Sequence, residues 1–338
     1  MRRSSKITAA QAQELSRQFD IIYPAATNIL GFEYGGGPGG HGGRDGDPKV
    51  QILVYDIVRA YEGDGIIAGF FSSRDWYTQA QLDAAGLNLK TNMAKIFYIN
   101  SRWVHMAPVG AARTLAHELQ HMINWNVNFV QNGQNVATWY NEMLSMMIDD
   151  VIADFIGLST TDVGHVILRI PTFLERYHEA GFTEWHQDLL SYARIYAFGA
   201  FLLRNFGGAE LVRRMMTSNA VNVASITAAL QATADVDFEY ALRRFGEAMV
   251  FSGSPIPEGV FTFDRSYTTT INGFTYISHA FDIWDMGGPH VFGLVPMTMR
   301  PHSVLLQSSD DWANISGDIS ITLQRPSDPS IALYLLVR

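Results

Sequence analysis

Two histidines and a glutamate near the middle of the chain have the spacing of a site that binds a metal ion and transfers a proton. They are His117, Glu118 and His121, in the pattern H-E-x-x-H. The apolar residues around them predict a helix over 113–124. Because four residues make about one helical turn, both imidazoles project from the same face and can bind one cation, with Glu118 beside them to accept a proton.

A third ligand separates this interpretation from a helix that carries His, Glu and His on its polar face by accident. Glu142 lies in a second predicted helix over 138–150, with twenty residues between it and His121. The connection over 126–138 is rich in Asn, Gln and Gly, as expected of a turn between helices. Two histidines and one carboxylate leave one tetrahedral position open, which is the catalytic form of a zinc site. The sequence therefore predicts one Zn²⁺ bound by His117, His121 and Glu142.

These two motifs carry a family resemblance. The segment HELQH followed by WYNEMLS resembles the gluzincin metallopeptidases, and HELQHMIN with NEMLSMMIDD is similar to the hyicolysin family, peptidase family M30, over roughly residues 10–215. Met143 stands where relatives often have Gly, and Met146 stands where thermolysin-like enzymes have an Asp. Asp149 shares the helical face of Glu142 and either replaces that Asp in orienting a ligand histidine or is an ordinary solvated residue at a helix end.

The resemblance implies a zinc-dependent metallo-endopeptidase with Glu118 as general base and acid. Peptide hydrolysis also needs a donor to the oxyanion. The segment over 192–207 resembles the tyrosine-bearing helix of related gluzincins, so Tyr192 is the candidate donor and Tyr196, one turn later, the reserve. A core tyrosine is the alternative for either residue. Two further readings stay open, namely an aminopeptidase of the same class, disfavoured because the G-x-M-E-N stretch is absent, and a non-catalytic cell-surface binding module.

Composition restricts the class of protein. Of the 338 residues, 47% are hydrophobic and 17% are charged, which is enough apolar material for a core. The net charge of −9 and the absence of a basic stripe argue against nucleic acid, so the expected partner is a peptide or protein substrate. There is no cysteine, which excludes disulfides and thiolate ligands. No run is long enough for a transmembrane segment. The resemblance implies an extracytoplasmic location, with a signal peptide already removed.

The pattern along the chain predicts an α+β fold in two domains. Residues 1–255 are expected to form a zincin-like metallopeptidase domain, with a small mixed sheet in 1–105 and a helical part in 106–255; residues 256–338 are expected to form a small all-β, sandwich-like domain. The expected strands of the sheet are 49–57, 65–72 and 95–100, and the third could be the edge strand that binds extended peptide. The expected strands of the C-terminal domain are 267–271, 274–277, 303–307, 319–323 and 331–337.

Other residues that could do chemistry have weaker patterns. The glycine-rich run over 35–48 lacks both phosphate-binding frames and predicts a loop near the cleft, in which His41 or the pair Asp45 and Asp47 is a minor metal-binding alternative. His178 and His186 could donate to the oxyanion, although an ordinary surface or partly buried role fits them better. Asn141 could shape the cleft, and His165 is isolated in the sequence and receives no role.

Overall fold

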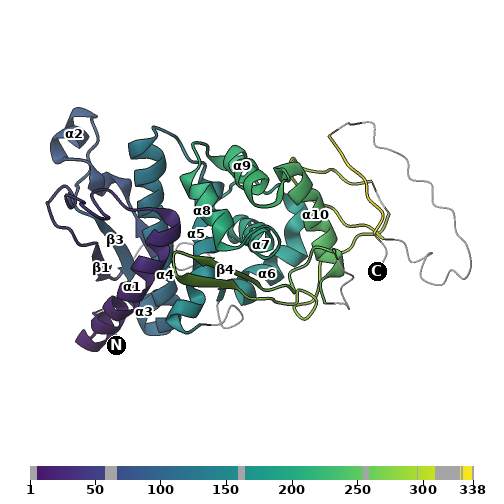
Figure 1. Ribbon diagram of the computed structural model, residues 1–338, viewed down its shortest axis with the longest axis horizontal. Helices are drawn as coiled ribbons and strands as arrows, with labels where there is room; N and C mark the ends of the chain where they lie inside the picture. The colour runs from purple at the N-terminus through teal and green to yellow at the C-terminus, as the bar shows by residue number, and fades with distance from the viewer. Residues whose placement is uncertain are drawn as a thin grey trace, which may run out of the picture.

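The structure is a computed structural model, and it describes residues 6–57, 67–158, 164–253, 259–294, 296–308, 328 and 330–336. A small sheet lies at the N-terminal end of the molecule, and the later helices gather beside it (Figure 1). The α-helices are α1 Ala9–Leu30, α2 Gln79–Ala84, α3 Ser101–Met106, α4 Pro108–Asn124, α5 Thr138–Ile152, α6 Gly164–Arg176, α7 Leu189–Asn205, α8 Ala209–Thr217, α9 Asn222–Ala234 and α10 Phe238–Phe251. Shorter helical segments are η2 Ser73–Trp76, η3 Trp125–Gln131, η4 Ala153–Ile156 and η5 Tyr177–Glu179.

Helix α1 is longer than its sequence pattern predicts. The sequence predicts a helix over residues 8–19, whereas α1 continues through Pro24 to Leu30. Proline removes one helical hydrogen bond and normally ends or bends a helix. Here the second half of α1 buries Ile22, Ile29 and Leu30 in the core shared with α4. Tertiary packing of this apolar face therefore outweighs the local cost of Pro24.

The N-terminal sheet has the strand order β1–β3–β2, with β1 Gln51–Tyr55, β2 Gly69–Phe71 and β3 Ile96–Asn100. β3 runs parallel to β1 and antiparallel to β2. All five residues of β3 are buried, as expected of a central strand. The suggestion that the third strand is the peptide-binding edge is therefore wrong, because β3 is hydrogen-bonded on both sides. The antiparallel edge is β2, which packs against α4.

Helix α5 lies in the middle of the helical part, between α4 and α7. Twelve of its fifteen residues are buried, so it is apolar on almost every side. A helix of this kind belongs to the interior of a large core. The connection from α4 begins with η3, a π-helical continuation of α4, and then turns back into α5. The two predicted motif helices are thus neighbours, and their facing sides are fixed by core packing.

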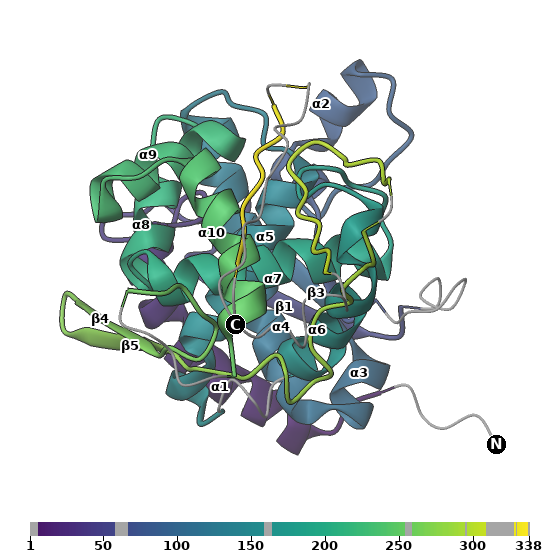
Figure 2. The same ribbon diagram turned by 90° about the vertical axis from the view of Figure 1, so that its right-hand side faces the viewer.

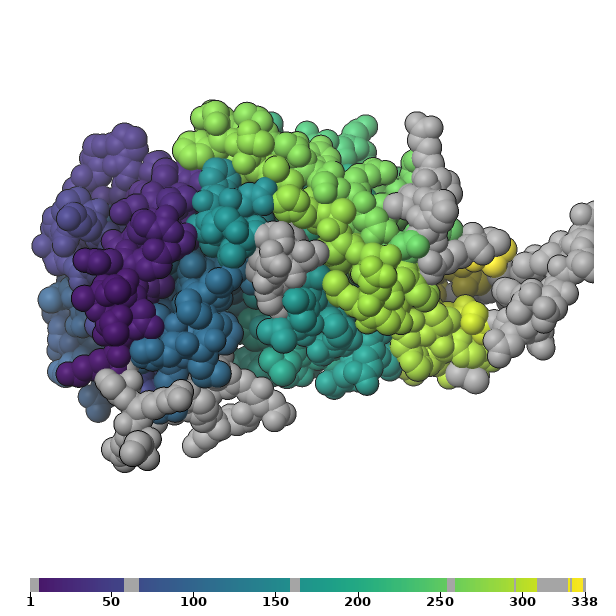
Figure 3. All heavy atoms as spheres, turned by 90° about the horizontal axis from the view of Figure 1, so that it is seen from below, coloured from purple at the N-terminus to yellow at the C-terminus, as the bar shows by residue number. Residues whose placement is uncertain are grey.

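The C-terminal region contains one β-hairpin among its described residues. The Asn272–Gly273 turn joins β4 Tyr267–Ile271 to β5 Phe274–Ser278, as the sequence predicts. In Figure 2 the hairpin lies alongside the helices, and in Figure 3 the light-green chain after residue 259 packs directly on the teal helical part. Tyr276 holds the hairpin against α1, because its side chain is buried and its hydroxyl donates to the carbonyl oxygen of Ala25 in that helix at 2.7 Å.

The other strands expected in this region have different outcomes. Residues 303–307 form only a single bridge, between Phe292 and Gln307, and residues 331–336 form no strand, so these two predictions are wrong for the described residues. The expected strand at 319–323 lies outside the described residues. The α+β class is confirmed by the mixture of helices and small sheets. The zincin-like arrangement of subdomains, the boundary near residue 255 and the C-terminal sandwich stay predictions.

Candidate metal centre

Helix α4 carries the H-E-x-x-H motif on the side that faces α5. Pro108 begins the helix at a position where its missing N–H costs nothing, and Leu115, Leu119 and Ile123 are fully buried on its apolar side. This burial fixes the rotation of the helix. His117 and His121 are then partly exposed on the same face, with ring centroids 4.8 Å apart.

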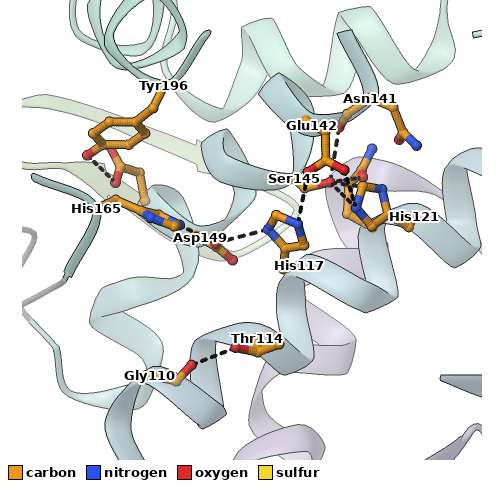
Figure 4. Close-up of polar contacts among 12 residues, drawn as sticks. Gly110, Thr114, His117, His121, Asn141, Glu142, Ser145, Asp149, His165 and Tyr196 are labelled. Carbon is orange, nitrogen blue, oxygen red and sulfur yellow. Dashed lines mark hydrogen bonds and ion pairs between the residues drawn. The ribbon is translucent and has the colours of Figure 1, made fainter. Parts of the chain in front are cut away.

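Glu142 of α5 points toward both imidazoles (Figure 4). Its Oε2 lies 3.3 Å from Nε2 of His117, and its Oε1 lies 3.6 Å from Nε2 of His121. Two ligands on a tetrahedral zinc ion are about 3.4 Å apart when each bond is roughly 2.05 Å. Oε2 of Glu142 is also buried and forms no hydrogen bond with the described residues. The donor set and its spacing therefore fit one cation at the centre of these three side chains.

Glu118 is the most buried of the four charged or metal-ligating residues, with 4% of its surface exposed. Its Oε2 has no hydrogen-bond partner among the described residues. Burial raises the pKa of the Glu118 carboxyl above its ordinary value, the two histidines oppose that shift, and the negative charge of Glu142 reinforces it. A carboxylate with a raised pKa is a stronger base, so the environment of Glu118 suits proton transfer.

Each histidine has a polar partner behind it on α5. Oγ of Ser145 lies 3.1 Å from Nδ1 of His121, and Oδ2 of Asp149 lies 3.4 Å from Nδ1 of His117. The partner at Nδ1 of His117 fixes the orientation of that ring and leaves its Nε2 facing Glu142, whereas Oγ of Ser145 also lies 3.4 Å from Nε2 of His121. Asp149 is only 3% exposed, which excludes the reading of a solvated residue at a helix end.

His165 of α6 is a residue that the sequence gives no reason to select. Its Nε2 lies 2.8 Å from the same Oδ2 of Asp149 that faces His117 (Figure 4). Burial and the charge of Arg113 lower the pKa of His165 to about 3, so its ring is neutral and can donate a single N–H to Asp149. No motif or spacing signals this contact, because His165 reaches the site only through the packing of α6 against α7.

The two candidate tyrosines have different surroundings. Tyr196 is 1% exposed, and its hydroxyl donates to Oδ1 of Asp150 at 3.0 Å, while Arg204 pairs with Oδ2 of Asp150 at 3.1 Å. Its hydroxyl is thus engaged in a buried structural network. Tyr192 is partly exposed, and its hydroxyl makes no hydrogen bond with the described residues. Burial raises the pKa of Tyr192 well above its ordinary value, and the negative charges of Glu142 and Glu118 add to the shift.

The weaker candidates lie elsewhere or have ordinary contacts. His41 and Asp45 are exposed, and neither belongs to a described cluster that could hold a cation. The His178 ring packs on Phe292, with centroids 4.5 Å apart, and the His186 side chain is 59% exposed.

Asn141 has a clearer place than its sequence context indicates. Its side-chain oxygen accepts a hydrogen bond from Nδ2 of Asn124 at 2.5 Å. Asn124 is the last residue of α4, so this contact ties the end of that helix to the start of α5. Asn141 thereby helps to hold the two ligand-bearing helices together.

Comparisons with known proteins agree with the motif. The family model described as Peptidase M30 matches residues 4–270 of the chain. The neutral metalloprotease ShpI of Staphylococcus hyicus is 31% identical over 115 residues, which is 30% of this chain and 23% of that protein. The aligned part therefore spans about a quarter of the relative's length. No helix in the described part of the chain has both the length and the apolar character needed to cross a membrane.

Proposed function

The chain belongs to the peptidase M30 family, and from that premise we propose that it is a zinc-dependent metallo-endopeptidase. The observation that carries the proposal is the convergence of His117, His121 and Glu142, from two helices, on one point with spacings suited to a tetrahedral cation. A zinc ion held there would polarise the scissile carbonyl and make a water molecule more acidic.

In this proposal Glu118 is the general base and then the general acid. Its carboxylate takes a proton from the attacking water and delivers it to the leaving nitrogen, for which its raised pKa is favourable. Ser145 and Asp149 keep the two ligand imidazoles in the tautomer that directs Nε2 toward Glu142. The Tyr192 hydroxyl, which has no partner among the described residues, donates to the oxyanion that develops on the substrate carbonyl.

Substrates are proposed to be peptides or proteins, cleaved internally. The antiparallel edge strand β2 beside α4 has no second strand partner among the described residues, so its outer main-chain groups are available to pair with an extended substrate, a mode of binding that tolerates many sequences. The lack of a G-x-M-E-N stretch supports endopeptidase over aminopeptidase activity. We propose an extracytoplasmic site of action on the family resemblance, and fractionation of cells that express the full gene would test it.

The direct test combines metal analysis with a casein digestion assay on the wild type and Glu118→Gln. We expect one zinc per chain in both proteins, casein cleavage by the wild type, and loss of cleavage by at least a hundredfold in the variant. A wild-type protein that holds zinc yet cleaves neither casein nor a peptide library would support the alternative, a non-catalytic binding module. Digestion of peptides with blocked N-termini separates endopeptidase from aminopeptidase activity.

A further inference from the structure

A guanidinium group that has no carboxylate partner among the described residues packs on the ring of Tyr192, the proposed oxyanion donor. Arg169 of α6 is partly buried, and its Cζ lies 4.9 Å from the centroid of the Tyr192 ring. The Arg169 guanidinium forms no ion pair and no hydrogen bond with the described residues, and its Nε is buried without a partner among them. Most other arginines of the described chain pair with acidic side chains, as Arg176 of the same helix does with Glu179 at 2.7 Å.

The electrostatic surroundings of Arg169 include two residues of the proposed site, Tyr192 and Glu142. Burial lowers the pKa of the Arg169 guanidinium, and the positive charge of Arg113 adds to this shift. Negative charge on Tyr192 or Glu142 acts in the opposite direction and raises the pKa. A partly buried cation without a counter-ion is unfavourable, and a ligand that carries a carboxylate would supply the missing charge. Arg113 is 6% exposed and deeper in the protein, whereas Arg169 keeps some access to solvent.

The stacking of Arg169 on Tyr192 also restricts its geometry. A guanidinium that packs over an aromatic ring is held in one plane, and its N–H groups then point outward around the edge of that plane. Such a fork matches the two oxygens of a carboxylate better than the single oxygen of a main-chain carbonyl. The ring that holds it belongs to the proposed oxyanion donor, so a group bound by Arg169 would lie near the scissile bond.

We propose that Arg169 forms a carboxylate-binding subsite that makes the enzyme prefer substrates with a carboxylate next to the cleaved bond. This inference rests on the proposed peptidase function. The carboxylate could come from an Asp or Glu side chain or from the free C-terminus of a short peptide. Both sources share one chemistry, and a matched set of peptides distinguishes them.

The experiment measures kcat/KM for two pairs of peptides. In the first pair a residue flanking the scissile bond is either Glu or Gln. In the second pair a shortened peptide ends either in a free acid or in an amide, so each pair has one acid and one neutral twin. The wild type should cleave one of the acids at least tenfold faster than its neutral twin. Arg169→Gln should bring that ratio to about one, because it should lower kcat/KM more for the acid than for its neutral twin. Arg169→Lys, which keeps the charge but not the fork, should show an intermediate ratio.

Arg176→Gln is the matched control, because Arg176 lies on the same helix but is paired and 46% exposed, and it should leave the ratio unchanged. Equal ratios in the wild type and Arg169→Gln would overturn the proposal. An equal loss of kcat/KM on all peptides in Arg169→Gln would also overturn it, because Arg169 would then bind the substrate main chain or support Tyr192. Circular dichroism melting checks that each variant is folded.

Binding provides a readout that does not depend on turnover. Calorimetric titration of the zinc-loaded Glu118→Gln protein with the same acid and neutral peptides should show tighter binding of the acid, and Arg169→Gln should remove the difference. If the protein cleaves nothing, the proposed function fails, yet a carboxylate preference lost in Arg169→Gln would still support the subsite. If cleavage occurs but neither readout shows a preference, the subsite fails and the function stands.

Discussion

Nδ1 of His117 lies 3.4 Å from Oδ2 of Asp149, about two helical turns beyond the glutamate that faces the other side of the same ring. A neutral imidazole that donates from Nδ1 to a carboxylate must present a lone pair at Nε2. Because Nε2 faces Glu142, Asp149 selects the tautomer that a metal ligand requires. Asp149 therefore acts on the candidate metal centre through His117.

The first prediction concerns this contact. Asp149→Asn keeps the shape of the side chain but removes the charge that favours the Nδ1–H tautomer. We expect the zinc affinity to fall by about 10–100-fold. Competition with a chromophoric chelator measures the dissociation constant, and Asp83→Asn, an exposed position in α2, is the control. An unchanged zinc affinity in Asp149→Asn would show that the contact has no influence on the metal.

A second prediction isolates His165. Its N–H holds Oδ2 of Asp149 at 2.8 Å, so His165→Ala should free the carboxylate to rotate and weaken zinc binding less than Asp149→Asn does. The loss of zinc affinity caused by His165→Ala should depend on the presence of Asp149. In the Asp149→Asn background, His165→Ala should cause little further loss, because the two residues act in series. Additive losses in the double variant would mean that His165 influences the site by another route.

A third prediction separates the two tyrosines. Tyr192→Phe should lower kcat by about 10²–10³-fold with a smaller change in KM, since the loss of one oxyanion donor acts on the transition state. Tyr196→Phe should leave kcat near the wild-type value but lower the free energy of unfolding by about 1–3 kcal/mol, because Asp150 loses a buried hydrogen bond. Steady-state kinetics and urea melts on both variants provide the comparison. The opposite pattern would assign the catalytic role to Tyr196.

The parts of the fold that sequence predicts well are those with a local cause. The spacing of His117 and His121 follows from helical geometry, and the Asn272–Gly273 turn requires positive φ at both residues, which the structure has. The extension of α1 past Pro24 and the central position of β3 depend on contacts between distant segments. The positions of His165 and Arg169 were not predictable for the same reason, because only the packing of α6 on α7 brings them beside Asp149 and Tyr192.

The C-terminal region shows the limit of strand patterns. Residues 303–307 and 331–336 are mostly apolar, yet they form one bridge and no strand. Alternating or apolar segments specify a strand only where a neighbour supplies hydrogen bonds. The hairpin over 267–278 succeeds because its partner is adjacent in sequence and its Tyr276 is anchored in the helical core.

A final prediction concerns Gly199, which lets α7 pack closely on the helix that carries Glu142. A Cβ at this position would lie 2.9 Å from Cγ of Met147 and 3.2 Å from Cγ of Met143, both on α5. Gly199→Ala should require Met147 to shift and should cause only a small loss of stability, because methionine side chains adapt and Ala favours the helix.

Gly199→Leu should be different, since Leu also favours the helix but needs far more space. We expect it to lower the free energy of unfolding by about 1–3 kcal/mol through overpacking. The displacement of α5 should also weaken zinc binding. Adding Met147→Ala should recover part of both losses by vacating the space that Leu needs, as urea melts and chelator competition would measure. If Met147→Ala only adds to the damage, the two helices do not meet at Gly199 in the way that positions Glu142.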